Sequence, residues 1–160
     1  YRGAKGCLFE GGLRVPSIVS LPGVIPQNEV RRQLATGCDW LPTIAEFCHA
    51  SLPNQKLDGK SLTRVISSPD EPSPHDHFYW RLGKGENAQW VVRQGDWKLL
   101  GNPRDRSDLA PLDADDRLFL VNLAQDVSER VNLAKNHPDI TQRLHTVHER
   151  YERELQAAQP

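Results

Sequence analysis

Apolar residues are distributed differently in the two halves of the chain. In the first half, the β-branched run at residues 15–21 lies between glycine and proline residues, which predicts a strand. The apolar stretch at residues 40–48 follows Asp39, a good N-cap, and carries Pro42 in its first turn, which predicts a helix. Its expected shared face consists of Leu41, Ile44, Ala45 and Cys48, and we expect the Cys48 side chain to be buried.

The second half reads as strands followed by one amphipathic helix. Strands are predicted at residues 77–81, 88–93, 96–100 and 118–123, and Gln94-Gly95 predicts a tight hairpin between the second and third. After Pro138, apolar residues recur at steps of three and four, which predicts a helix with one stripe against a sheet. The stripe consists of Ile140, Leu144, Val147, Tyr151 and Leu155.

Composition narrows the class of protein. The chain has 160 residues, of which 38% are hydrophobic and 26% charged, so it can bury a modest core. Its net charge of -1 argues against a nucleic-acid partner, and no apolar run is long enough to span a membrane. The chain lacks Met and begins at Tyr1, so we expect a fragment of a longer protein.

The first segment carries the most unusual chemistry. Lys5 lies between Gly3 and Gly6, and glycines allow a backbone to approach a ligand while lysine supplies a point charge for an oxyanion. Glu10 and Arg14 place an acid and a base near a second glycine pair. From these residues alone, a solvated glycine loop with an ion pair is the simpler interpretation, because short glycine motifs are common by accident.

The ordered motifs of the chain resemble those of the sulfatase family. The segment Arg2-Gly3-x-Lys5-Gly6-x-x-x-Glu10-Gly11-Gly12-x-Arg14-Val15-Pro16 is similar to the second sulfatase signature. Downstream, the similar motifs are Asp39-Trp40-Leu41-Pro42-Thr43, Leu57-Asp58-Gly59-Lys60-Ser61-Leu62, Trp97-Lys98-Leu99 and Leu120-Val121-Asn122-Leu123. The series covers nearly the whole chain in order, so together it is far more specific than any one motif.

The resemblance implies a fold of the α/β class in the alkaline-phosphatase superfamily. Residues 1–66 are then the end of the catalytic α/β domain, and residues 67–76, which are rich in proline, form a linker. Residues 77–160 are expected to form an antiparallel four-stranded sheet packed on a helix.

The resemblance also implies a mechanism. Sulfatases use a formylglycine nucleophile, made from Cys or Ser in a Cys/Ser-x-Pro-x-Arg motif, beside a calcium ion. None of Cys7, Cys38 and Cys48 begins such a motif. We therefore expect the nucleophile and the calcium ligands to lie upstream in the missing N-terminal part, and this chain alone to be inactive and without a metal site. The family's sulfate-contacting lysine corresponds to Lys5.

Further expectations follow from the resemblance. We expect His77 or Arg81 to border the pocket for the sulfate ester, a sulfated sugar or an aryl sulfate, although ordinary surface positions are the simpler alternative. No acid or cysteine completes a zinc set with His75 and His77. The family implies a periplasmic or secreted protein. A phosphonate or phosphodiester hydrolase of the same superfamily and a non-catalytic binding module are the alternative functions.

Overall fold

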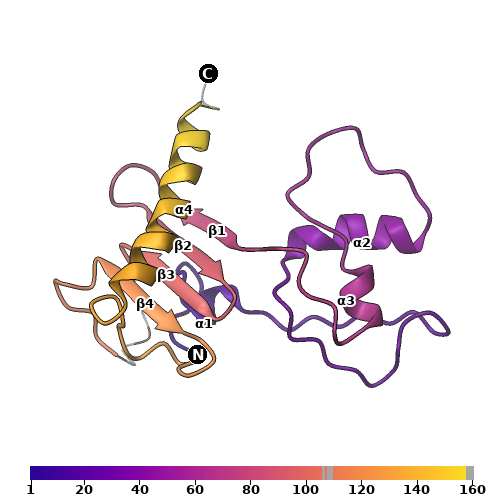
Figure 1. The fold of residues 1–160 in the computed structure, drawn as a ribbon, viewed down its shortest axis with the longest axis horizontal. Coiled ribbons are helices and arrows are strands. Elements are labelled where there is room, and N and C mark those ends of the chain that lie inside the picture. Colours follow the sequence, from indigo (N-terminus) through magenta and orange to yellow (C-terminus); the bar gives the residue numbers. More distant parts are fainter. Residues whose placement is uncertain (106, 108–109, 158–160) are drawn as a thin grey trace. The chain divides into compact units, whose positions relative to one another are not determined.

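The computed structural model describes residues 1–105, 107 and 110–157 (Figure 1). The chain divides into two compact units. One unit combines residues 1–16 with residues 77–160, and the other consists of residues 17–76. The start of the chain therefore belongs structurally with its second half.

The first unit is built on an antiparallel sheet, as the alternation of apolar strands and turns predicts. Its strands are β1 (Phe78–Leu82), β2 (Gln89–Gln94), β3 (Trp97–Gly101) and β4 (Leu118–Asn122), in the spatial order β1-β2-β3-β4. Gln94 pairs with Trp97 at the β2–β3 hairpin, so the turn residues are Gly95 and Asp96. The turn lies one residue later than predicted, and Gly95 takes the positive φ of 57° that it requires.

Alternation along the strands gives this sheet two apolar faces. One face is covered by α4 (Pro138–Ala157), as Figure 1 shows, and its buried side chains are Trp90, Val92, Leu99 and Leu120 with Leu144 of the helix. The other face is covered by the start of the chain, where Leu8 and Phe9 pack against Val91, Leu100, Phe119 and Val121. Cover on both faces explains why most side chains of the central strands β2 and β3 are buried.

Aromatic stacking supplements the apolar stripe of α4. The stripe is centred on Leu144, which is fully buried, whereas Leu155 at the end of the helix is exposed. The His148 ring stacks on Trp90 with centroids 3.8 Å apart, and Tyr151 stacks on Tyr79 at 4.6 Å. The Tyr79 hydroxyl donates to Glu152 at 2.7 Å. The helix is thus held by rings and polar groups as well as by aliphatic contacts.

The second unit contains short helices joined by irregular chain. They are a 3-10 turn η1 (Gly37–Asp39), α2 (Trp40–Phe47) and α3 (Thr63–Ser67). The predicted strand at residues 15–21 is wrong, because this segment has no regular structure. Its side chains Val15 and Ile18 are 78% and 94% exposed. A strand needs a neighbour to accept its backbone hydrogen bonds, and no described strand pairs with this segment.

The predicted helix at residues 40–48 is confirmed, but the buried face is different. Leu41 and Ile44 are exposed, and Cys48 is exposed rather than buried. The buried residues are Pro42, Thr43 and Ala45. Only Ala45 of the predicted face is therefore buried.

A polar interaction network turns α2 in this way. Thr43 donates to the Asp39 carbonyl at 2.6 Å, and its hydroxyl accepts from the Leu62 amide at 2.9 Å. The Asp39 carboxylate accepts from the amides of Thr36 and Lys60 and lies 2.7 Å from His75 Nε2. Asp39 thus precedes α2 as predicted, but its carboxylate caps the preceding 3-10 turn. Buried polar groups require these partners, and the requirement outweighs the apolar pattern.

Within the described residues, no helix has the length and apolar composition that crossing a bilayer demands.

The stacked His148 predicts a pH-dependent stability. Burial lowers the pKa of His148 below its ordinary value of 6.5. The His148 imidazole therefore binds a proton more weakly in the folded chain than in the unfolded chain. The contribution of this group to stability is therefore complete above pH 6.5 and falls as the pH drops below it. Urea unfolding of the wild type should show this loss as the pH falls from about 6.5 to about 5, and His148→Gln should flatten it.

His49→Asn, which removes an exposed imidazole of the second unit, is the control and should retain the loss. An NMR titration that places the His148 pKa at or above 6.5 would contradict this account.

Candidate functional site

Lys5 occupies the tip of a tight turn formed by residues 4–7. The Cys7 amide donates to the Ala4 carbonyl at 3.1 Å, and Gly6 has a φ of 89°, which type II turns require at their third position. Lys5 is exposed and makes no hydrogen bond or ion pair with the described residues. The turn thus presents an uncommitted ammonium group on a defined backbone.

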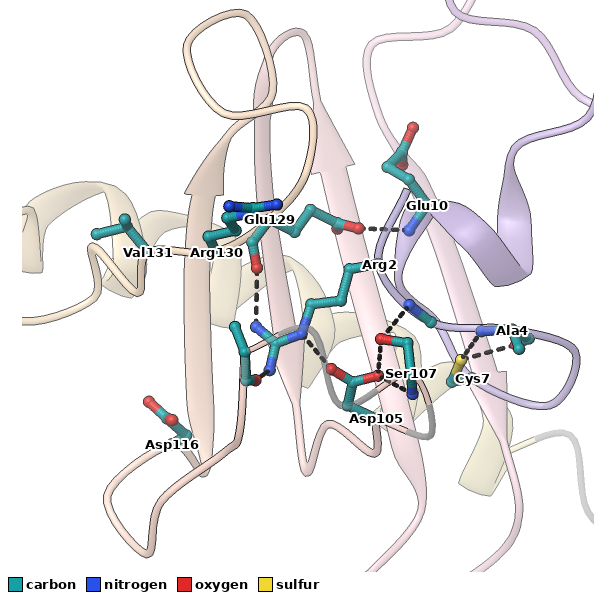
Figure 2. A network of polar contacts seen from close by, with 12 residues as sticks. Arg2, Ala4, Cys7, Glu10, Asp105, Ser107, Asp116, Glu129, Arg130 and Val131 are labelled. Atoms are coloured by element: carbon teal, nitrogen blue, oxygen red, sulfur yellow. Dashed lines mark hydrogen bonds and ion pairs between the residues drawn. The ribbon is translucent and has the colours of Figure 1, made fainter.

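The Cys7 thiol closes the same turn from inside. Its Sγ lies 2.8 Å from the Ala4 amide nitrogen and 2.7 Å from the Ala4 carbonyl oxygen, and the residue is buried (Figure 2). The sequence excluded Cys7 as the start of a nucleophile motif and indicated no other role for it. In the structure it is a small buried side chain that restrains the turn behind Lys5.

The glycine pair of the signature allows close backbone packing. The Gly11 amide donates to the Arg2 carbonyl at 2.7 Å, at the start of α1 (Glu10–Leu13). A Cβ added at Gly11 would lie 2.4 Å from the Gly3 carbonyl oxygen, and one at Gly12 would lie 2.0 Å from the Cys7 carbonyl oxygen. These glycines therefore hold α1 against the Lys5 turn, and their role here is structural.

Arg2 anchors the start of the chain in the first unit (Figure 2). Its guanidinium is fully buried and donates to Asp105 Oδ2 at 2.5 Å, to the Glu129 carbonyl at 2.8 Å and to the Ala110 carbonyl. The same group lies 4.3 Å from the centre of the Phe9 ring. A buried arginine needs this complete set of acceptors, so the residues around it are fixed in place.

Asp105 completes the anchor from the loop after β3. Burial favours the neutral carboxyl, but hydrogen bonds from Ser107 and Arg2 outweigh burial and lower the pKa of Asp105 below its ordinary value. The Ser107 hydroxyl also accepts from the Gly3 amide at 3.1 Å. Asp105 therefore stays ionised as the partner of Arg2 at neutral pH.

A buried ion cluster joins the signature segment to the sheet. Lys98 Nζ, in β3, donates to Glu10 Oε1 at 2.9 Å and to Glu129 Oε1 at 2.8 Å. Glu129 also accepts from the Glu10 amide at 2.5 Å. All three side chains are at most 2% exposed, and burial raises the pKa of Glu129 despite the neighbouring ammonium.

The sequence indicated an acid–base pair of Glu10 and Arg14, and the structure places their charged atoms 3.6 Å apart. The sequence did not indicate Lys98 or Glu129, which the structure shows to be the principal partners of Glu10. One signal was present: Lys98 interrupts an apolar strand at a position where a surface residue is not expected. A lysine at such a position implies a buried acidic partner.

His77 and Arg81 lie on the side of the sheet that packs against α4. His77 Nε2 is 3.0 Å from Arg150 Nη2 and 3.3 Å from the Tyr151 hydroxyl, and Arg81 forms an ion pair of 2.8 Å with Glu152. Lys5 belongs to the segment that covers the other face. The structure therefore does not bring the three predicted residues together, and a substrate role for His77 or Arg81 stays a prediction.

No group of three His, Cys, Asp or Glu side chains within the described ranges is arranged to hold a metal ion.

The comparisons with known proteins agree with this architecture. Residues 4–156 match the family model described as N-sulphoglucosamine sulphohydrolase, C-terminal, so the chain belongs to this family of sulfatase C-terminal domains. Arylsulfatase A from Bos taurus is 32% identical over 82% of the chain, and a sulfatase from Formosa agariphila is 33% identical over 84%. The chain spans 28% and 25% of these two proteins.

Solved structures give the same fold. One, from work on glycosaminoglycan metabolism by Bacteroides thetaiotaomicron, covers 94% of this chain with a TM-score of 0.67 at 24% identity, and the chain covers 32% of it. Another was solved in complex with its substrate D-glucosamine-2-N,6-O-disulfate and covers 76% of this chain, with a TM-score of 0.53 at 16% identity; the chain covers 24% of it. The expected fold class is therefore confirmed.

Removing the central cation of the buried cluster should be costly. Lys98→Met keeps most of the side-chain volume but leaves two buried carboxylates without their ammonium partner, so we expect a loss of about 3–5 kcal/mol in the free energy of unfolding. Urea unfolding followed by tryptophan fluorescence measures it. Lys135→Met, which removes an exposed lysine from its pair with Asp115, should leave the midpoint unchanged.

Adding Glu10→Gln and Glu129→Gln to Lys98→Met should recover part of the lost stability, because the uncompensated charges are then gone. No recovery in this triple variant would show that packing, and not charge, makes Lys98 necessary.

The tight packing behind Lys5 gives a second prediction. Gly12→Ala places a methyl group against the Cys7 carbonyl, so the backbone must shift and we expect a loss of about 1–3 kcal/mol. Gly37→Ala is the matched control, because an added Cβ there meets nothing within 4 Å. Denaturant unfolding compares the two variants, and equal stability for both would contradict the structural role of Gly12.

Proposed function

We propose that this chain is the C-terminal part of a sulfatase that hydrolyses sulfate esters. The observation that carries the proposal is the family match over residues 4–156, which includes the turn that presents Lys5. In the complete enzyme, a formylglycine nucleophile and a calcium ion outside this chain would supply attack on sulfur and charge neutralisation. This chain alone is then inactive.

Lys5 is assigned to the sulfate group of the substrate. An ammonium group on a restrained turn can neutralise charge on a sulfuryl oxygen without reorganising during the reaction. Its exposure and its lack of an ionic partner within the described residues support this assignment. Arg2, Glu10 and Lys98 have no such freedom, since each is buried and engaged, and they position the turn instead.

The proposed substrate is a sulfated sugar or an aryl sulfate. Relatives named arylsulfatase, such as the Bos taurus protein, and the structural neighbour solved with D-glucosamine-2-N,6-O-disulfate support this range. A periplasmic or secreted location belongs to the same proposal and rests on the family. A substrate contact by His77 or Arg81 belongs to the same proposal. It would have to form while His77 keeps its contact with Arg150 and Arg81 its ion pair with Glu152.

The experiment uses the longest natural reading frame that contains this chain, expressed together with a formylglycine-generating enzyme. We expect hydrolysis of 4-nitrophenyl sulfate or of a sulfated monosaccharide, and Lys5→Ala should lower kcat/KM by about a hundredfold to a thousandfold without altering the folded state. Lys56→Ala, which removes an exposed lysine of the second unit, is the control and should leave activity unchanged.

A preference for phosphonates or phosphodiesters in the same substrate panel would favour the superfamily alternative. No hydrolysis of any ester by the long protein would favour a non-catalytic module.

A further inference from the structure

A hollow of about 340 Å³ lies beside the Lys5 turn in the first unit. Gly6, from the turn itself, forms part of its wall. The polar part of the remaining wall comes from Lys84 and Asn87 in the connection between β1 and β2, from Gln89 at the start of β2, and from Arg104 after β3. Ligand pockets usually measure about 300–1,000 Å³, so this one suits one or two sugar rings.

The wall of the hollow is positively charged. Among the described residues, its charged lining side chains are Lys84 and Arg104, none of the lining side chains is a carboxylate, and neither cation makes an ion pair. A neighbouring hollow shares Asn87 and Arg104 but is also lined by Arg117, Asp113 and Asp116, so its two positive and two negative charges balance. The hollow beside Lys5 is therefore the one that favours an anion.

The Gln89 side chain needs a hydrogen-bond donor, which an anion alone does not supply. The residue is only 4% exposed, and its Nε2 donates weakly to the Gly6 carbonyl at 3.4 Å. Its Oε1 is buried and has no hydrogen-bond partner within the described part of the chain. A buried carbonyl oxygen without a donor is unfavourable, so this atom calls for an O–H or N–H from a ligand.

We infer that this hollow binds a sugar that carries a sulfate or carboxylate group. The anionic group would lie between Lys84 and Arg104, and a hydroxyl or amide N–H of the sugar would donate to Gln89 Oε1. That this sugar is part of the substrate rests on the proposed function. On that basis the substrate carries a second negative group besides the sulfate held by Lys5, which favours a multiply charged glycan over a simple aryl sulfate.

Binding can be measured on this chain as it stands. Glucose 6-sulfate is titrated into the ¹⁵N-labelled chain, with glucose and sodium sulfate as separate probes. We expect glucose 6-sulfate to shift the amide signals of residues 83–89 and the Gln89 side-chain NH₂ signals, and glucose to bind at least about tenfold more weakly. Added salt should weaken binding because the cations are exposed.

Variants then locate the site. Lys84→Ala and Arg104→Ala remove exposed side chains and should each weaken binding about tenfold or more while leaving the spectrum of the folded chain intact. Arg143→Ala, which removes an exposed arginine of α4, should bind as the wild type does. Gln89→Leu should weaken glucose 6-sulfate but leave any binding of inorganic sulfate unchanged, which separates sugar recognition from simple charge.

Some outcomes would overturn the inference. Equal binding of sodium sulfate and glucose 6-sulfate would mean that the hollow attracts anions without recognising a sugar. Shifts confined to residues outside the hollow, or loss of binding in Arg143→Ala only, would place the ligand elsewhere. Sugar binding by this chain without sulfatase activity in the long protein would refute the proposed function and leave the binding site standing.

Discussion

The first unit depends on the buried contact of Lys98 with Glu10 and Glu129. Desolvating three charges is expensive, and the expense is offset only while the ammonium touches both carboxylates. Because Glu10 begins α1, Lys98 lies in β3 and Glu129 follows β4, the cluster fixes the relative position of three segments that are far apart in sequence. The apolar contacts of Leu8 and Phe9 with the sheet then form around this fixed point.

The placement of Lys5 follows from this constraint. Arg2 precedes the Lys5 turn and Glu10 follows it, and both are buried against the same unit. The turn is therefore held at both ends, while its tip stays exposed. The segment thus combines buried flanking charges and closely packed glycines with an exposed lysine, and the proposed contact of Lys5 with a sulfate oxygen would need such a fixed position.

Local pattern and long-range contact explain what the sequence could and could not predict. The strands of the sheet and α4 follow from periodicity, because each buries an apolar stripe on a nearby partner. The cluster does not, since Glu10 and Lys98 are 88 residues apart and neither periodicity nor spacing connects them. The error at residues 15–21 has the same origin: β-branched residues suit a strand, but only a neighbouring strand makes one. At α2, the partners of Asp39 and Thr43 decided which face is buried.

The polar side chains on the two sides of the sheet are used differently. On the α4 side, His77, Arg81 and Tyr79 all engage the helix, so their polar groups are used for packing. On the other side, the covering segment uses its buried charges to dock and leaves Lys5, with Lys84 and Arg104 near the hollow, without ionic partners among the described residues. Gln89 Oε1 is buried without a donor among the described residues, which is unfavourable, and the like charges of Lys84 and Arg104 repel each other. A ligand with negative groups and hydroxyls would satisfy both at once, which is the reason we infer that recognition takes place on the Lys5 side of the sheet.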